Sequence, residues 1–290
     1  MIQAISISDS HSSPGSVNRA NEDALGGNRD CAFVIDGATG LGDVQLIDGH
    51  PSDAAWLASF VRECLEENFH RHSPIRPFVR DMIVQSREAF LSTVVADDIA
   101  KYAWPAASFA MLFLAQESLW FAGLGDCTLY VQSDKGVQII NPLDKFEGQE
   151  ASHAATHLQR TGGFSAQKNL LSDPHTLENL RHIRSLQNTA ESGVWTLGLV
   201  PEAAEHMVIQ KVVVEANSHA LLCSDGFSAL HSDYRSYTAE ALLEAARDNG
   251  LKPLMDELRH IETSIDPEGL KYPRYKQSDD ATALLVELSI

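Results

Sequence analysis

Residues 31–37, which read CAFVIDG, decide the fold prediction, because an apolar run long enough for a buried strand ends there in an aspartate and a glycine. Two later stretches repeat the arrangement, AGLGD at residues 122–126 and LLCSDG at residues 221–226. An ionised carboxylate at the end of a buried strand is costly unless it is paired or bound to a metal ion. Asp36, Asp126 and Asp225 are therefore the first candidates for a shared site.

Further acids lie in loops next to predicted strands. Glu22 and Asp23 occupy the loop after the first strand, and Asp279 and Asp280 come directly before the last one. Taken singly, such acids are usually solvated, and Asp-Gly is a common turn dipeptide. Taken together, with few basic residues beside them, they indicate convergence on a hard cation such as Mg²⁺ or Mn²⁺ rather than zinc. A glycine after an aspartate, such as Gly37, also allows its carbonyl to approach an ion closely.

The composition is that of an acidic globular protein. The 290 residues carry 40 Asp and Glu against 22 Lys and Arg, a formal charge of −18, which argues against nucleic acid and anionic membranes as partners. We expect neither a secretory signal nor a membrane span, because no basic and apolar leader and no 18-residue apolar run is found. The four scattered cysteines favour reduced thiols in a cytoplasmic protein.

Hydrophobic periodicity predicts blocks of strands and pairs of helices. The predicted strands cover residues 2–7, 31–35, 108–115, 118–123, 127–132, 136–140, 206–215, 219–223 and 281–288. The predicted helices cover residues 53–69, 77–95, 238–248 and 253–263. The segment from 141 to about 193 is the least regular, and we expect a flap-like region with a short helix or two. Grouped strands and helices favour an α+β layered sandwich over a doubly wound parallel sheet.

Five short motifs in this order resemble those of metal-dependent protein phosphatases of the 2C type, the bacterial members in particular. They are NEDA at 21–24, VIDGATG at 34–40, GD at 125–126, SDG at 224–226 and DDAT at 279–282. No single motif is specific, but five in sequence over nearly the whole chain are stronger evidence. The resemblance implies one catalytic domain over residues 1–290, built as a four-layer αββα sandwich of two antiparallel sheets flanked by helix pairs.

The resemblance also implies a metal-binding role for five residues. Asp36 would bridge two Mg²⁺ or Mn²⁺ ions. Glu22 and the carbonyl of Gly37 would bind one ion, and Asp225 and Asp279 would bind the other. Two divalent ions about 3.5–4 Å apart can activate a water for attack on phosphorus, so that no covalent phospho-enzyme is needed.

Further implied roles surround this pair of ions. Asp126 matches the acid associated with a weaker third ion, which it would share with Asp225, and Asp23 would orient water. The implied activity is hydrolysis of phosphoserine and phosphothreonine in a phosphorylated protein or peptide. A partner Ser/Thr kinase system would phosphorylate that substrate.

Three positions depart from the family pattern. An arginine that binds substrate phosphate usually lies four residues before Glu22, but this chain has Asn18 there, so Arg19 is the candidate for that contact. Ala38 stands where many eukaryotic members have a histidine, a candidate general acid, and Asp280 replaces a common asparagine. None of these changes removes a predicted metal ligand.

Two other functions stay open on the sequence. The displaced arginine is also compatible with a catalytically weak or inactive regulatory module that binds a phosphoprotein, and the metal site is compatible with a hydrolase of small phosphate esters. A zinc site at His153 and His157 is disfavoured, because the general-base glutamate of a metalloprotease motif is missing. We expect substrate choice to reside in residues 141–193 and in surface loops.

Overall fold

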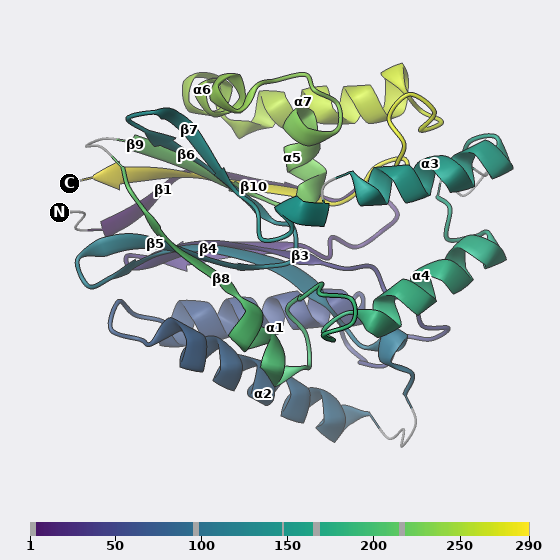
Figure 1. Cartoon of the computed structure of the whole chain (residues 1–290), viewed down its shortest axis with the longest axis horizontal. Coiled ribbons are helices and arrows are strands. Elements are labelled where there is room, and N and C mark those ends of the chain that lie inside the picture. Colours follow the sequence, from purple (N-terminus) through teal and green to yellow (C-terminus); the bar gives the residue numbers. More distant parts are fainter. Residues whose placement is uncertain (1–3, 95–98, 147, 165–168, 215–217, 290) are drawn as a thin grey trace.

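The computed structural model describes residues 4–94, 99–146, 148–164, 169–214 and 218–289. The described strands form two five-stranded antiparallel sheets, which pack face to face in the middle of the molecule (Figure 1). The first sheet has the order β1 (Ala4–Ser13), β10 (Ala281–Ser289), β9 (Ser218–Cys223), β6 (Thr128–Ser133) and β7 (Gly136–Ile140). The second has the order β2 (Ala24–Asn28), β3 (Cys31–Gly37), β4 (Ala107–Ala115), β5 (Ser118–Leu124) and β8 (Val208–Val212).

Helices cover the outer face of each sheet, which confirms the predicted αββα sandwich (Figure 1). The second sheet is covered by α1 (Asp53–Asn68) and α2 (Ile75–Thr93), and the first by α5 (Asp225–Ser232), α6 (Ala239–Asn249) and α7 (Leu251–His260). Two more helices, α3 (Gln149–Thr161) and α4 (Pro174–Leu186), lie beyond the end of the sandwich where β3 ends and β10 begins. No helix in the described part of the chain is long and apolar enough to cross a membrane.

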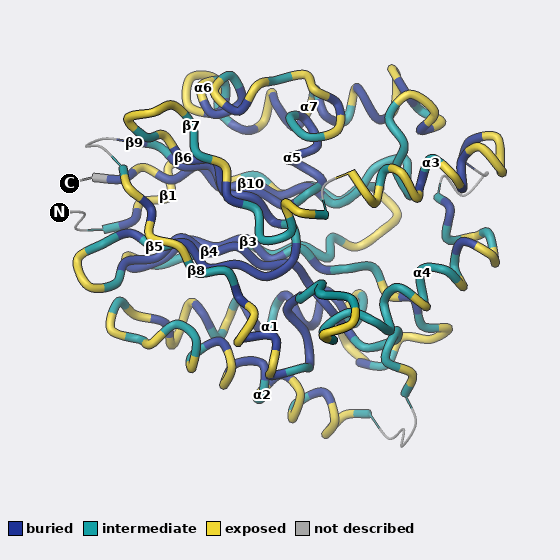
Figure 2. The backbone as a smooth tube through the Cα atoms, viewed as in Figure 1, coloured by how far each residue is buried: buried dark blue, intermediate teal, exposed yellow. Residues whose placement is uncertain are grey.

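Strand β3 explains why residues 31–37 form a continuous apolar run. Phe33 and Ile35 pack into the layer between the second sheet and helices α1 and α2, whereas Ala32 and Val34 pack into the layer between the two sheets. Successive side chains of a strand point to opposite faces, so a strand that is covered on both faces must be apolar throughout. Figure 2 shows this burial in both sheets, with exposed residues on the outer sides of the helices.

Several elements differ from the sequence prediction. The sequence does not predict β2, whose two glycines have low strand propensity, but the chain pairs there with β3 in the register Gly26↔Phe33. Strand β1 continues through a polar stretch to Ser13, because β10 pairs with it up to the end. Helix α5 is not predicted either. Residues 201–206 form a 3₁₀-helix, so β8 begins later than expected.

The segment 141–193 holds α3 and α4, as the prediction of a short helix or two requires. Their capping follows the usual chemistry: Asp173 accepts a hydrogen bond from the backbone N–H of Thr176 at the start of α4, and Gly162 in a left-handed conformation ends α3. His153 and His157, for which the sequence disfavours a zinc site, lie on α3. His157 is buried and its Nδ1 lies 2.9 Å from the hydroxyl of Thr176, which is a packing role.

Candidate metal centre

Three strand ends from both sheets bring their acids together at one edge of the sandwich. Asp36 lies near the end of β3, Asp126 follows β5, and Asp225 follows β9 as the first residue of α5. One carboxylate oxygen of each lies within 4.8 Å of the others. Among the described residues, this is the one group of three or more His, Cys, Asp or Glu side chains placed closely enough to hold an ion. The structure thus brings together three of the acids that the sequence predicts to converge.

The pKa values of these three acids are all raised, because the carboxylates are buried and lie close to other acids. Burial raises the pKa of Asp36, and the carboxylates of Asp23 and Asp126 add to the rise. Burial also raises the pKa of Asp225, to which Asp36 and Asp126 contribute. Burial is also the main reason that the pKa of Asp126 is raised. The hydroxyl of Ser108, which donates a 2.5 Å hydrogen bond to this carboxylate, partly offsets the rise. Carboxylates in such a group are held ionised most readily by a bound cation.

Asp23 lies close to the same group, and its carboxylate is unusual. Both of its oxygens are buried, and neither accepts a hydrogen bond from a residue that the structure describes. Burial raises the pKa of Asp23 to about 8, with smaller contributions from Asp280, Asp279 and Asp225 and an offset from the nearby hydroxyl of Thr282. Unsatisfied buried acceptors in a native structure call for an explanation such as an ion or water. A hydrated cation held by the neighbouring acids supplies such donors, so the residues present fit Mg²⁺ or Mn²⁺.

Glu22 and Asp279, the other two predicted carboxylate ligands, lie outside the group of three and make contacts of their own. The carboxylate of Glu22 accepts hydrogen bonds from Thr39 Oγ1 at 2.8 Å and from Ser52 Oγ at 2.5 Å, the N-cap of α1. The carboxylate of Asp279 is paired with the ammonium of Lys276. Burial alone would raise the pKa of Asp279, but Lys276 outweighs it and lowers that pKa.

A cavity of about 410 Å³ opens beside these two residues. Glu22, Thr39, Lys276 and Asp279 line it, as does Arg19, whose side chain is exposed. Arg19, the predicted candidate for the phosphate contact, is thus part of the wall of this cavity. Its lining carries charged side chains of both signs.

Asp280 has a defined structural role rather than that of a solvated surface acid. Its two carboxylate oxygens accept one backbone N–H each, from Gly15 at 2.8 Å and from Glu22 at 2.7 Å. An asparagine has a single acceptor oxygen and could not satisfy both donors. The aspartate at this position thereby fixes the backbone of the loop that carries Glu22.

The two Asp-Gly steps of the site are places of close backbone approach. A Cβ on Gly37 would lie 2.3 Å from the carbonyl oxygen of Glu22, and a Cβ on Gly226 would lie 2.0 Å from the carbonyl oxygen of Asp280. Any larger residue would push these loops apart, and with them the acids they carry. The sequence prediction assigned the carbonyl of Gly37 to an ion; the structure adds this second reason for a glycine.

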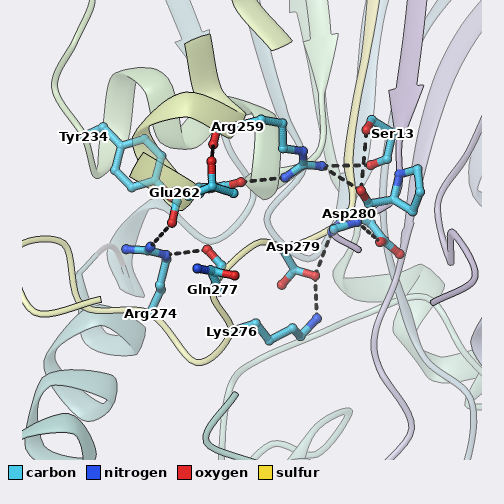
Figure 3. Close-up of polar contacts among 12 residues, drawn as sticks. Ser13, Tyr234, Arg259, Glu262, Arg274, Lys276, Gln277, Asp279 and Asp280 are labelled. Atoms are coloured by element: carbon cyan, nitrogen blue, oxygen red, sulfur yellow. Dashed lines mark hydrogen bonds and ion pairs between the residues drawn. The ribbon is translucent and has the colours of Figure 1, made fainter. Parts of the chain in front are cut away.

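A buried polar network anchors the loop that precedes β10 (Figure 3). Arg259 of α7 donates to Glu262 at 2.7 Å and to the carbonyl of Ser13 at 2.9 Å, which ties this helix to the end of β1. Arg274 donates to Asp266 at 2.8 Å. These contacts hold the ends of the segment that presents Lys276, Asp279 and Asp280, whose contacts Figure 3 also shows.

Several residues of the site are absent from the sequence prediction. Ser108 and Ser52 are recognisable only after folding, because their partners lie far away in the chain. The sequence positions of Thr39 and Lys276, each close to a predicted metal ligand, could have indicated a role in the site. Thr39 stands three residues after Asp36, and Lys276 is a basic residue three positions before Asp279.

The fold is that of PPM-type serine/threonine phosphatases. The catalytic domain of the serine/threonine phosphatase PstP, solved with two manganese ions, aligns with a TM-score of 0.52 at 16% identity over 99% of both chains. PppA, a regulatory component of the type VI secretion system of Pseudomonas aeruginosa, gives 0.53 and 17% over 99% of both chains. Stp1 from Staphylococcus aureus gives 0.51 and 15% over 100% of this chain and 98% of that one. No protein-family model and no curated protein sequence matches the chain. At these identities the likeness establishes the fold, and the activity must be argued from the site.

Proposed function

We propose that the protein is a metal-dependent phosphatase that hydrolyses phosphoserine and phosphothreonine in proteins or peptides, with two Mg²⁺ or Mn²⁺ ions as cofactors. The observation that carries the proposal is the group of three strand-end carboxylates within 4.8 Å of one another, beside the unpartnered Asp23. The fold, shared with phosphatases of which one was solved with two manganese ions, supports it.

Each predicted ligand has a place in this proposal. Asp36 would bind both ions, and Asp225 would bind one of them. Glu22 and Asp279 would hold the ions from the wall of the cavity, together with the carbonyl of Gly37. When bound, the ions supply a Lewis acid that lowers the pKa of water and neutralises phosphoryl oxygens.

The remaining roles belong to the chain itself. Asp23, whose oxygens are buried and unpartnered, would accept the hydrogen bonds of the attacking water and orient it. Asp126 and Asp225 would share a weaker third ion. Arg19 would contact the phosphorylated substrate from the wall of the cavity that it lines.

We further propose that residues 1–290 act as one catalytic unit in the cytoplasm. Helices α3 and α4 would form the flap-like segment that contributes to substrate choice, because they lie at the end of the sandwich that carries the acids (Figure 1). The substrate would be a protein phosphorylated by a Ser/Thr kinase. The net charge of −18 continues to argue against nucleic acid and membranes as partners.

The proposal is tested by hydrolysis of a phosphothreonine peptide with Mn²⁺, with Mg²⁺ and with EDTA. The variants Asp36→Asn and Asp225→Asn should lower kcat by at least about a hundredfold, since each removes a charged ligand from the group of three. Asp256→Asn is the matched control, because this exposed acid of α7 pairs only with Lys252 among the described residues. Turnover in EDTA, or full turnover in both ligand variants, would refute the proposal.

The same measurements separate the two alternatives. Calorimetric binding of Mn²⁺ without hydrolysis of any phosphopeptide or aryl phosphate would identify a regulatory module. Hydrolysis of small phosphate esters with a higher kcat/KM than phosphopeptides would identify a small-molecule hydrolase.

A further inference from the structure

Lys276 is a cation that lies between two predicted metal ligands, Asp279 and Glu22, in the wall of the cavity. Its side chain is only 16% exposed. The ammonium donates to Asp279 and, at 3.0 Å, to Thr39 Oγ1, and Thr39 in turn donates to Glu22. Lys276 therefore contacts one predicted metal ligand directly, as Figure 3 shows for Asp279. It contacts a second, Glu22, through the hydroxyl group of Thr39.

The ammonium has a donor to spare. A lysine carries three N–H donors, and the described residues accept two of them from Lys276. Since Lys276 lines the cavity of about 410 Å³, a group inside that cavity can accept the third.

The pairing with Asp279 does not prevent that carboxylate from binding an ion. Lys276 and the backbone N–H of Asp280 both donate to Oδ1 of Asp279. A carboxylate offers two oxygens with about four lone-pair positions. Oδ2 is thus available to a cation while Lys276 remains on Oδ1.

We infer that Lys276 binds the phosphoryl group of the substrate, in place of the arginine whose position is taken by Asn18. This inference rests on the proposed function and deepens it. Lys276 is held in place by two hydrogen bonds, so little conformational freedom is lost when it meets a phosphoryl oxygen. Arg19 has an exposed side chain, where salt screens its charge and binding must first order it. Lys276 therefore makes the inner contact, to a phosphoryl oxygen, and Arg19 contacts the substrate further out.

The test is binding of inorganic phosphate to the Mg²⁺-saturated protein, measured by calorimetry. A hydrogen bond to a charged group is worth about 1.5–3 kcal/mol, so Lys276→Met should weaken phosphate binding by about 10- to 100-fold. Lys276→Arg should retain most of the affinity because it keeps the charge. Lys271→Met is the matched control, since this exposed lysine lies in the same loop, over the ring of Tyr272 and outside the cavity lining.

Two further measurements distinguish a phosphate contact from a merely structural role. Titration with Mn²⁺ should show unchanged or tighter metal binding in Lys276→Met, because a competing cation is removed from Asp279. Lys276→Gln keeps hydrogen-bonding capacity without the charge, and a melting temperature near that of the wild type would show that it folds. It should lose phosphate affinity as Lys276→Met does, whereas Arg19→Met should lose less.

Unchanged phosphate affinity in Lys276→Gln and Lys276→Met would overturn the inference, and so would a parallel loss of Mn²⁺ and phosphate. No phosphate binding by the wild type would overturn it as well. The proposed function fails separately: a wild type that binds phosphate through Lys276 but never hydrolyses a phosphopeptide refutes the enzyme and keeps the contact. Hydrolysis of a phosphopeptide that is unaffected by replacement of Lys276 refutes the contact and keeps the proposed enzyme.

Discussion

Replacement of Asp280 by asparagine is a sharp test of how the structure positions Glu22. The substitution introduces the residue that is common at this position in the phosphatases that the sequence resembles. It changes neither the size nor the shape of the side chain. In this chain the two oxygens of Asp280 accept the backbone N–H groups of Gly15 and Glu22, at 2.8 and 2.7 Å. An asparagine turns its NH₂ group toward one of these donors, which then loses its partner.

The expected loss in the free energy of unfolding is that of one of the two hydrogen bonds to Asp280. A hydrogen bond to a charged acceptor contributes about 1.5–3 kcal/mol, and an unsatisfied buried donor costs about 1–3 kcal/mol. Since Gly15 and Glu22 are only partly buried, water offsets part of the loss. We expect Asp280→Asn to lower the free energy of unfolding by about 1–3 kcal/mol.

Urea unfolding in EDTA at pH 7, followed by tryptophan fluorescence, measures this change without a contribution from bound metal. The control is Asp256→Asn, which breaks an exposed i, i+4 pair with Lys252 and should cost no more than about 0.5 kcal/mol. A second readout is Mn²⁺ affinity, which should fall because the loop carrying Glu22 is no longer fixed. Equal urea midpoints for the two variants would refute the assigned role of Asp280.

Two further predictions concern neighbouring positions. Gly37→Ala should lower the free energy of unfolding by about 1–3 kcal/mol and weaken Mn²⁺ binding, because its Cβ would lie 2.3 Å from the carbonyl oxygen of Glu22. Gly40→Ala is the control, since nothing lies within 4 Å of a Cβ there, and an equal loss in both variants would contradict the steric argument. In EDTA, Asp23 should make the protein less stable as pH rises from about 4 to about 8, because the folded state keeps a proton that the unfolded chain releases near pH 3.8. Asp23→Asn should reduce this slope in pH-dependent urea unfolding, and an unchanged slope would show that Asp23 is ionised in the folded protein.

Local sequence was sufficient to predict an element where the apolar pattern of one segment shows which of its faces are buried. The run 31–37 is apolar because both faces of β3 are covered, and the acid after it marks the strand end. The same signal located Asp126 and Asp225, and the structure brings both to Asp36. Helix α1 was recognisable from its apolar spacing, and the predicted range 53–69 agrees with Asp53–Asn68.

Local sequence was insufficient where pairing with another strand forms the element. Strand β2 contains Gly26 and Gly27 and is a strand because β3 pairs with it. The polar end of β1 extends as far as Ser13 because β10 continues alongside. Strand propensity describes the preference of each residue by itself. In β2 and at the end of β1, pairing with a neighbouring strand outweighs that preference.

The sequence by itself determined most of the strands, four of the helices and the acids that stand at strand ends, since these follow from periodicity and burial along a short stretch. Only the tertiary structure decided which acids share a group. Asp36, Asp126 and Asp225 meet across two sheets, whereas Asp279 is paired with Lys276. It also decided that Asp280 holds the backbone of Glu22, 258 residues away in the chain. The physical reason is that hydrogen bonds and ion pairs depend on distance in space, and a folded chain sets that distance through the packing of all its layers.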